Sequence, residues 1–257
     1  MRYGLLGKTL GHSYSKIIHE MLGRYEYELI EVPEERLDAF LRDRYFDGLN
    51  VTIPYKQAVI PYLHAMSDRA EAIGAVNTIV NRDGQLIGDN TDFGGLMALI
   101  ARTGLRLKGK TVLIAGTGGT SKTARAVAKA LGASNIFRLT RNDGPSEADL
   151  LTYEDAYAKR ADAEILINTT PAGMYPNTEG IPVDLDRLPG LTGVIDVVYN
   201  PTPTRLVREA RERGICAESG LYMLVAQAML AAERFTGEEI PGDVTDRIYG
   251  ELLRALS

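Results

Sequence analysis

The sequence predicts an α/β fold in two lobes, and three observations support this. The chain has 257 residues, a length that suits two modest domains. Short apolar runs alternate with helical patterns from the start, as they do in βαβ units with parallel sheets. A polar, basic stretch at 106–110 interrupts this alternation, which then starts again. We therefore place one domain at 1–102 with 236–257 and the other at 103–235.

The first domain begins with alternating strands and helices, and a hairpin follows. The expected strands are 2–6, 27–32 and 48–51, and the expected helices are 15–22, 34–42 and 57–64. Two more strand-like pieces, 76–81 and 85–88, flank Asp83-Gly84, and Asp-Gly is a turn signal of hairpins. We predict that this hairpin forms the edge of the sheet and that a helix over 92–102 follows it.

The second domain repeats the alternation, which predicts a doubly wound sheet. Its expected strands are 111–115, 135–140, 164–168 and 193–197, and its expected helices are 121–131, 153–159 and 204–213. Two helical patterns, 221–235 and 244–256, come after the last strand. Because that sheet is already complete, we expect the chain to return at its end and pack on the first domain.

The composition is that of an ordinary globular protein. A formal charge of −5 gives no general attraction to nucleic acid or to an anionic membrane surface. No apolar run approaches the roughly 18 residues that span a membrane, and the start does not resemble a signal peptide. Cys216 has no partner for a disulfide or for a CxxC metal site. We expect a cytoplasmic monomer or homodimer without a bound metal.

A glycine-rich turn follows the first strand of the second domain. Gly116, Gly118 and Gly119 lie between that strand and a helical run, and Ser121 stands at the place of a third glycine. Glycines let the backbone approach a pyrophosphate, whose charge the N–H groups of the next helix attract. The turn, which includes Thr120, therefore predicts dinucleotide binding in a Rossmann-like domain. A tight turn with a purely structural role is the alternative.

The end of the next strand indicates which dinucleotide binds. An Asp or Glu about 20 residues beyond the glycines selects NAD, whereas an Arg accommodates the 2′-phosphate of NADP. Here the strand ends in Thr140-Arg141, and the guanidinium offers a fixed fork of donors to a phosphate. We therefore predict NADP. Arg141 as a solvated loop residue is the alternative, and Asp143 leaves weak NAD use open.

Polar segments also follow the expected strands of the first domain, where ligands of open α/β sheets bind. Ser13 and Ser15 are expected on one side of an extended segment, spaced to bind a carboxylate or hydroxyls. Ser15 can also cap the next helix. Lys56 follows Pro54, which suits the first turn of a helix, and Asp92 begins another helix. An exposed lysine and a helix-capping aspartate are the alternatives for these two.

Eight motifs run through both domains: Ser13-Tyr14-Ser15, Asn50-Val51-Thr52 through Lys56, Ala75-Val76-Asn77-Thr78, Asn90-Thr91-Asp92, Gly116 to Ser121, Asn168 to Met174, Asp196 to Pro201, and Gly220 to Gln227. In order and spacing these motifs resemble the shikimate dehydrogenase family. The resemblance implies an N-terminal α/β substrate domain and a Rossmann-like dinucleotide-binding domain. It also implies NADP-dependent interconversion of 3-dehydroshikimate and shikimate in a cleft between the lobes.

The resemblance implies a role for each matched residue. Lys56 and Asp92 would be the catalytic pair, because hydride transfer to a ketone creates alkoxide character that an ammonium stabilises and protonates. The substrate carboxylate would meet Ser13, Ser15 and Tyr199, and the ring hydroxyls would meet Thr52, Asn77, Asp92 and Gln227. The dinucleotide would meet Gly116, Gly118, Gly119, Thr120, Ser121, Thr140, Arg141, Thr169, Gly220 and Met223.

Four positions depart from the family pattern: Lys16, Thr140, Ser219 and Tyr222. A tyrosine at 222 crowds the nicotinamide side, and no second basic residue follows Arg141 closely, so NADP preference is expected to be modest. A core position on the helix over 221–235, without contact to the dinucleotide, is the alternative for Met223. Two further functions remain as alternatives: a quinate or shikimate dehydrogenase that uses NAD, and a non-catalytic sensor of shikimate-pathway metabolites.

Overall fold

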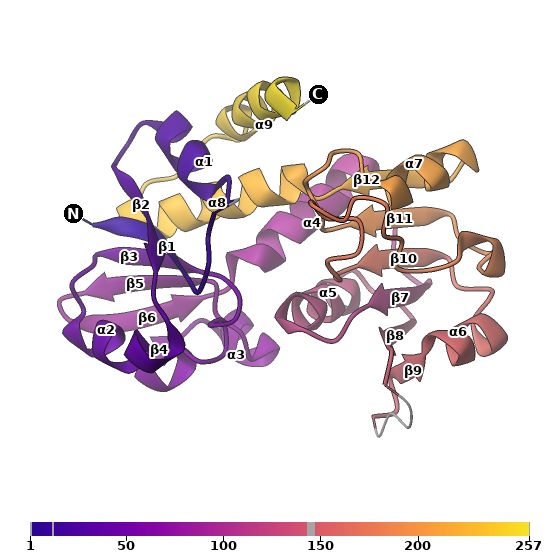
Figure 1. Cartoon of the computed structure of the whole chain (residues 1–257), viewed down its shortest axis with the longest axis horizontal. Coiled ribbons are helices and arrows are strands. Elements are labelled where there is room, and N and C mark those ends of the chain that lie inside the picture. Colours follow the sequence, from indigo (N-terminus) through magenta and orange to yellow (C-terminus); the bar gives the residue numbers. More distant parts are fainter. Residues whose placement is uncertain (1, 12, 143–146, 257) are drawn as a thin grey trace. The chain divides into compact units, whose positions relative to one another are not determined.

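The computed structural model describes residues 2–11, 13–142 and 147–256. Contacts along the chain divide it into two compact units (Figure 1). The first unit contains the residues up to Gly95 together with Leu224–Leu252. The second contains Leu96–Met223 and the residues from Leu253 onward. Each unit has its own six-stranded sheet.

The sheet of the first unit is mixed, with the strand order β2-β1-β3-β5-β6-β4. Its strands are β1 (Tyr3–Gly7), β2 (Tyr27–Glu31), β3 (Gly48–Val51), β4 (Ala65–Met66), β5 (Thr78–Arg82) and β6 (Gln85–Asp89). Strand β1 pairs in parallel with both β2 and β3, and Tyr3 lies opposite Tyr27 and Gly48. The hairpin strands β5 and β6 run antiparallel to each other, and β5 runs antiparallel to β3. The carboxyl ends of β1 and β3 therefore lie at the same edge of the sheet.

Helices cover both faces of this sheet. The helices that lie wholly or partly in this unit are α1 (Ser15–Leu22), α2 (Leu37–Asp43), α3 (Asp68–Ile73), α4 (Thr91–Thr103), α8 (Leu221–Thr236) and α9 (Gly242–Leu256). Successive strand residues point to opposite faces. Leu6 packs with Leu41 of α2, whereas its neighbour Leu5 packs with Ala231 and Phe235 of α8. The segments that carry the predicted substrate residues therefore start from a sheet that is covered on both sides.

The second unit has a parallel, doubly wound sheet with the strand order β12-β11-β10-β7-β8-β9. Its strands are β7 (Thr111–Ala115), β8 (Asn135–Thr140), β9 (Leu150–Thr152), β10 (Ile165–Asn168), β11 (Gly193–Asp196) and β12 (Cys216–Ser219). Its helices include α5 (Gly119–Ala130), α6 (Tyr153–Lys159) and α7 (Arg205–Glu212). The strand order reverses at β7, and ligands of such sheets bind at this switch point. The predicted two-part α/β fold is confirmed.

Three details of the first unit differ from the prediction. The expected helix 57–64 is a set of turns with a short 3₁₀ helix at Ile60–Tyr62, because Pro61 lacks the N–H that an α-helix needs there. The short strand β4 pairs outside β6, so the hairpin lies one strand in from the edge. Helix α3 was not predicted, although the hydroxyl of Ser67 accepts from the N–H of Ala70 and caps it.

The contacts also group the chain differently from the predicted domain boundaries. We expected the chain to return to the first domain at 236, after the helix over 221–235. The structure places Leu224–Leu252 in the first unit, where Phe235 stacks on Tyr3 at 5.0 Å between ring centroids. The return therefore begins near the start of α8.

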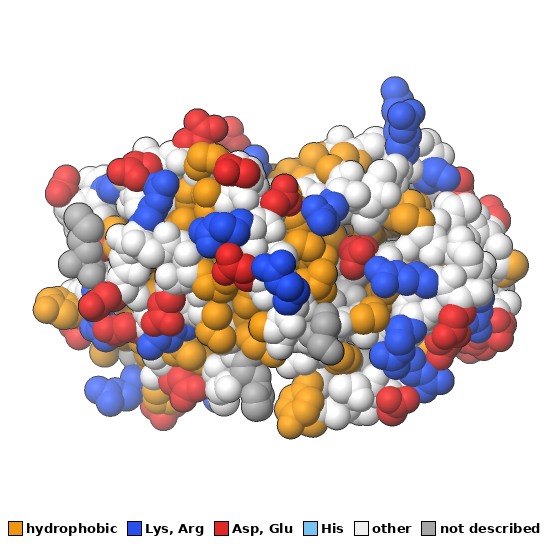
Figure 2. Space-filling model, turned by 90° about the horizontal axis from the view of Figure 1, so that it is seen from above, with side chains coloured by type: hydrophobic (Ala, Val, Ile, Leu, Met, Phe, Trp, Pro, Cys, Tyr) orange, Lys and Arg blue, Asp and Glu red, His pale blue; other side chains and the backbone are white. Residues whose placement is uncertain are grey.

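Charged side chains of both signs are interspersed on the face of the molecule that Figure 2 shows. No helix in the described parts of the chain has the length and apolar character that crossing a membrane requires.

Candidate active site

Lys56 and Asp92 meet inside the first unit. Lys56 Nζ donates to Asp92 Oδ2 at 2.6 Å, and the two side chains are only 17% and 11% exposed. A charge-assisted hydrogen bond of this length fixes the ammonium in one place. The structure thus brings together the two residues that we predicted to act as a pair.

Backbone hydrogen bonds hold Lys56 in a turn after β3. The N–H of Tyr55 donates to Thr52 O at 2.9 Å, and the N–H of Val76 donates to Lys56 O at 2.8 Å. The prediction that Lys56 lies in the first turn of a helix is therefore wrong. The alternative of a solvated lysine is also wrong, because the side chain is mostly buried. Two chain segments fix the position of its backbone instead.

Asp92 lies in the first turn of α4, and a different residue caps that helix. Asn90 Oδ1 accepts from the N–H of Phe93 at 3.2 Å, and Asn90 Nδ2 donates to Ala75 O at 2.9 Å. Asp92 as the N-cap is therefore wrong. Because Asn90 provides the cap, the Asp92 carboxylate is available to bind Lys56.

Asn77 fixes the start of the same helix. Its Oδ1 accepts from the N–H of Thr91 at 2.7 Å and from the hydroxyl of Thr78 at 3.0 Å. Its Nδ2 donates to Thr91 Oγ1 at 3.1 Å. These contacts occupy the amide oxygen and leave one N–H that can meet a substrate hydroxyl. Asn77 therefore supports the start of α4, and its contact with substrate stays a prediction.

The two serines do not share an extended segment. Ser15 is the first residue of α1, and the preceding Tyr14 has a helical backbone with φ −84° and ψ −3°. The hydroxyl of Ser13 accepts from the N–H of Ser15 at 3.2 Å, and Ser15 does not occupy the cap position. Both the extended segment and the Ser15 cap are therefore wrong. The hydrogen bond at the start of α1 instead keeps Ser13 close to Ser15.

Thr52 and Gln227 come from opposite ends of the sequence but both belong to the first unit. The N–H of Thr52 donates to Leu6 O at 2.9 Å, which fixes the backbone just after β3. Gln227 lies on α8, where its Nε2 donates to Leu224 O at 2.8 Å. This bond leaves its amide oxygen able to accept from a ligand hydroxyl.

Asp89 is a site component that we did not single out from the sequence. It is 8% exposed and accepts from Ser67 Oγ at 2.6 Å, the N–H of Asn90 at 2.7 Å and Arg234 Nε at 2.7 Å. Burial works against ionisation, but these hydrogen bonds lower the pKa of Asp89 below its usual value. The ionised carboxylate thus anchors the segment that leads into Asp92.

In the second unit, the glycine-rich turn depends on one backbone conformation. Gly116 has φ +107°, and a Cβ added there would lie 2.8 Å from Thr169 Oγ1. Thr169 Oγ1 in turn donates to Ala115 O at 2.6 Å. Glycine is required at 116 because both its conformation and the adjacent threonine exclude a side chain. The structure places these two predicted dinucleotide-site residues side by side.

Helix α5 starts at Gly119, two residues earlier than predicted, so Gly119 and Thr120 belong to its first turn. The cap residue Gly118 provides no side-chain hydrogen bond, and a Cβ added to it would meet nothing within 4 Å. Ser121 is fully buried and donates to Gly116 O at 2.7 Å, which closes the turn. This twelve-residue helix therefore starts beside open space at Gly118, and this arrangement fits a dinucleotide pyrophosphate.

The end of β8 presents Arg141 to solvent. Thr140 is buried and its Oγ1 accepts from the N–H of Asn142 at 3.1 Å. Burial raises the pKa of Tyr153, and the positive charge of Arg141 nearby partly opposes this rise. Arg141 is thus exposed beside the switch point, as a 2′-phosphate site needs. Asp143 lies outside the described residues.

Gly220 is required for packing within the second unit. A Cβ added there would lie 2.2 Å from Val197 O, and its N–H donates to Val198 O at 2.9 Å. Met223 is 6% exposed at the start of α8, and Tyr199 is half-buried in the segment after β11. Both belong to the second unit. The predicted contact of Tyr199 with the substrate carboxylate, and that of Met223 with the nicotinamide, stay predictions.

Asp196 organises the same segment, and we predicted no role for it from the sequence. It is fully buried and accepts from Asn168 Nδ2 at 2.9 Å, the N–H of Val198 at 3.0 Å and Thr204 Oγ1 at 2.7 Å. Burial raises the pKa of Asp196 to about 6, although these hydrogen bonds oppose the rise. In the sequence, only its place in the motif from Asp196 to Pro201 could have indicated that this residue matters.

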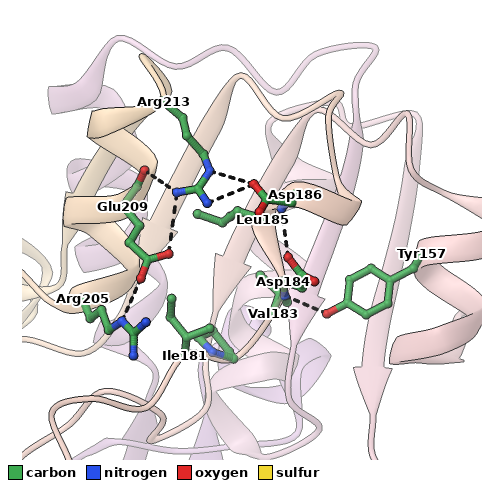
Figure 3. Close-up of a pocket in the computed structure, with 10 residues that line it drawn as sticks. Tyr157, Ile181, Val183, Asp184, Leu185, Asp186, Arg205, Glu209 and Arg213 are labelled. Carbon is green, nitrogen blue, oxygen red and sulfur yellow. Dashed lines mark hydrogen bonds and ion pairs between the residues drawn. The ribbon is translucent and has the colours of Figure 1, made fainter.

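A separate pocket in the second unit lies between α7 and the segment around 181–187 (Figure 3). Its charged side chains bind one another: Arg213 pairs with Asp186 at 3.0 Å, and Arg205 pairs with Glu209 at 2.7 Å. None of the predicted site residues lines it. We therefore place the candidate active site at the strand ends instead.

Comparison with known proteins adds independent findings. Residues 5–79 match the model of the shikimate dehydrogenase substrate binding domain. A shikimate dehydrogenase (NADP(+)) of Symbiobacterium thermophilum is 38% identical, with 94% of this chain and 90% of that protein covered.

Solved structures of similar length share the fold. Shikimate dehydrogenase 1 from Peptoclostridium difficile is 34% identical with a TM-score of 0.90, covering 99% of this chain and 98% of that one. Shikimate 5-dehydrogenase from Thermus thermophilus, in complex with NADP(H) and shikimate, is 30% identical with a TM-score of 0.85, covering 98% and 99%. A quinate dehydrogenase from Corynebacterium glutamicum, in complex with NAD, is 28% identical with a TM-score of 0.84 and covers 99% of each chain. The fold alone therefore does not select the substrate.

Proposed function

The chain belongs to the shikimate dehydrogenase family, and we propose that it catalyses the NADP-dependent, reversible reduction of 3-dehydroshikimate to shikimate. Its relatives of similar length carry this activity in their names. The observation that supports catalysis most directly is the 2.6 Å contact between Lys56 Nζ and Asp92 Oδ2. A sensor of the same metabolites would not need a buried ammonium held by a carboxylate.

The proposed mechanism gives Lys56 the role of general acid. NADPH, when bound, supplies the hydride that the carbonyl carbon receives. As the carbonyl oxygen gains negative charge, Lys56 Nζ stabilises it and donates the proton that completes the alcohol. Asp92 keeps Nζ in position before the step through the 2.6 Å contact. In the reverse direction Lys56 takes the proton from the alcohol.

We assign substrate recognition to the polar groups around this pair. Ser13 and Ser15 at the start of α1 bind the carboxylate, and Tyr199 contributes a further hydroxyl. The ring hydroxyls meet Asp92 and the side chains of Thr52, Asn77 and Gln227. The amide groups of Asn77 and Gln227 support this assignment, because the contacts described above leave an N–H on Asn77 and the amide oxygen on Gln227 for a ligand.

We assign NADP binding to the second unit, within the domain predicted at 103–235. The open first turn of α5 would hold the pyrophosphate, and Arg141 would hold the 2′-phosphate. The residues of this proposed site are Gly116, Gly118, Gly119, Thr120, Ser121, Thr140, Arg141, Thr169, Gly220 and Met223. The substrate-binding domain is proposed at 1–102 with 236–257, as predicted from the sequence, and the contacts group most of α8 with it.

We further propose that the protein works in the cytoplasm as a monomer or a homodimer. The free, exposed thiol of Cys216 supports a reducing compartment. Light scattering coupled to gel filtration measures the mass in solution, and a mass above that of a dimer would contradict this proposal.

The test of the function is the initial rate at 340 nm with shikimate and with quinate, each with NADP and with NAD. We expect the highest kcat/KM with shikimate and NADP. A higher kcat/KM with quinate or with NAD would change the proposed substrate or coenzyme, but the reaction would still be a dehydrogenation. Shikimate binding without turnover under all four conditions would favour the metabolite sensor.

A further inference from the structure

A buried aromatic pair lies between α1 and β2 of the first unit. The His19 side chain on α1 is fully buried, and its ring stacks on that of Tyr27 in β2 with centroids 3.9 Å apart and planes 8° apart. His19 Nδ1 lies 2.7 Å from the hydroxyl of Tyr25. The proposed reaction gives no role to His19 or to Tyr27.

His19 is held in its neutral form. Burial lowers the pKa of His19 from 6.5 to about 3, although the neighbouring Asn50 side chain favours the charged ring. If Tyr25 donates to Nδ1, the ring proton is on Nε2. Nε2 is buried and makes no well-formed hydrogen bond among the described residues. The ring therefore acts as a flat, uncharged packing group at neutral pH.

One connection from this pair leads to the serines. Ser15 precedes His19 by four residues on α1, so both side chains lie on the same face of the helix. Both are buried, and Ser13 is tied to Ser15 by a hydrogen bond of 3.2 Å. Stacking His19 on Tyr27 thus fixes the rotation of α1, and with it the direction of the two hydroxyls.

A second connection leads across the sheet to the start of α4. The hydroxyl of Tyr27 donates to Asn50 Oδ1 at 2.7 Å, and Asn50 Nδ2 donates to Thr78 Oγ1 at 3.2 Å. Thr78 Oγ1 donates to Asn77 Oδ1 at 3.0 Å, which also accepts from the N–H of Thr91. Each member of this chain is at most 5% exposed. Water therefore does not readily replace a missing link.

We propose that His19 and Tyr27 are positioning residues that place the carboxylate-binding serines and the catalytic pair on one shared support. Thr91 precedes Asp92 at the start of α4, so the Tyr27 hydroxyl acts on the Lys56–Asp92 contact through the buried chain. The His19 ring acts on Ser15 through α1. This inference rests on the proposed function, because it assigns the two sides of the site to one substrate.

The kinetic test separates the two connections. Tyr27→Phe keeps the stacked ring and removes the hydroxyl, so we expect kcat to fall about tenfold while KM for shikimate changes by less than about threefold. His19→Leu removes the stacked ring, so we expect KM for shikimate to rise about tenfold with a smaller change in kcat. A purely structural role would lower the melting temperature and leave kcat and KM of the folded enzyme unchanged.

Tyr3→Phe is the matched control. Tyr3 lies in the same core as Tyr27, but its hydroxyl faces Phe235 O at 3.5 Å instead of the polar chain. The kcat and KM of the Tyr3→Phe variant are expected to stay within about twofold of the parent. If Tyr27→Phe does not fold, Thr78→Val cuts the same chain one link further on and must lower kcat in the same way.

A second measurement does not depend on activity. Backbone amide resonances of Thr91 and Asp92 are expected to shift in ¹⁵N-labelled Tyr27→Phe and to stay in place in Tyr3→Phe. An inactive parent chain would defeat the proposed function, and the resonances would still decide whether Tyr27 acts on α4. Unmoved resonances with kcat within about twofold of the parent, or equal losses in Tyr3→Phe, would overturn the inference.

Discussion

The two units build their candidate sites in different ways. In the first unit buried polar side chains bind one another: Asn77 holds Thr91, and Asp89 holds the N–H of Asn90. In the second unit the backbone forms the site, because Gly116 takes a left-handed conformation and Gly118 leaves the start of α5 open. The first site should therefore be sensitive to the loss of single polar groups. The second should be sensitive to added bulk.

The largest effect is expected for Lys56→Ala in the first unit. Removing the general acid should lower kcat by about 10² to 10⁴-fold, while shikimate binding is mostly kept, because the ammonium matters most where charge develops. Rates at 340 nm and shikimate calorimetry measure the two quantities. Lys8→Ala, an exposed lysine of the same unit paired with Glu34, is the control and should match the parent. A kcat for Lys56→Ala within a few-fold of the parent would remove Lys56 from the mechanism.

Two glycine substitutions sharpen the comparison in the second unit. Gly220→Ala places a Cβ against Val197 O and should lower the free energy of unfolding by about 3 kcal/mol.

In Gly118→Ala the added Cβ meets no protein atom, so the free energy of unfolding should stay within about 0.5 kcal/mol of the parent. Because that Cβ enters the space proposed for the pyrophosphate, KM for NADP should rise about tenfold. Urea unfolding and steady-state kinetics check these outcomes, and an unchanged KM in Gly118→Ala would place the pyrophosphate elsewhere.

Local patterns in the sequence predicted most strands and the Rossmann-like unit. The glycine-rich turn after β7 and the run at β8 are encoded within a few residues, and the structure shows both. The helix expected at 57–64 failed for a local reason that the sequence also contains, namely Pro61. The strand β4 has two residues, which is too short for a period-two pattern to be seen.

The support beneath the site could not be predicted in the same way. Asn77 and Thr91 are 14 residues apart, and Tyr27 and Asn50 are 23 apart. Only the pairing of the strands brings these side chains together, and neither residue type is unusual where it stands. Lys56 and Asp92 were expected to act together because of the family resemblance, since the 36 positions that separate them carry no local signal.

The second unit also contains a buried ionisable side chain, Asp196, although its candidate site is otherwise formed by the backbone. The pKa of Asp196 in the folded chain is about 6, above its ordinary 3.8. Its contribution to stability is therefore complete below pH 3.8 and is lost as the pH rises through 6. Asp196→Asn keeps an oxygen for Asn168 and offers an N–H to Thr204. At pH 7 this variant should be more stable than the parent by about 2 kcal/mol, and near pH 4 the difference should vanish.

Urea unfolding from pH 4 to pH 8 measures this difference, with Asp162→Asn, exposed in the same unit, as the control. A variant less stable than the parent at pH 7 would mean that the hydrogen bonds to the ionised carboxylate outweigh its burial.

The smallest effect is expected for Arg141→Ala, because this side chain is exposed at the end of β8. Loss of one charge-assisted contact to the 2′-phosphate should raise KM for NADP about tenfold and leave KM for NAD within about twofold. Steady-state rates with each coenzyme give both values, and Arg106→Ala, another exposed arginine of the second unit, should change neither. Equal losses with NADP and NAD would show that Arg141 does not contact the 2′-phosphate. Coenzyme choice would then depend on the backbone-built turn, and the contrast between the two units would become sharper.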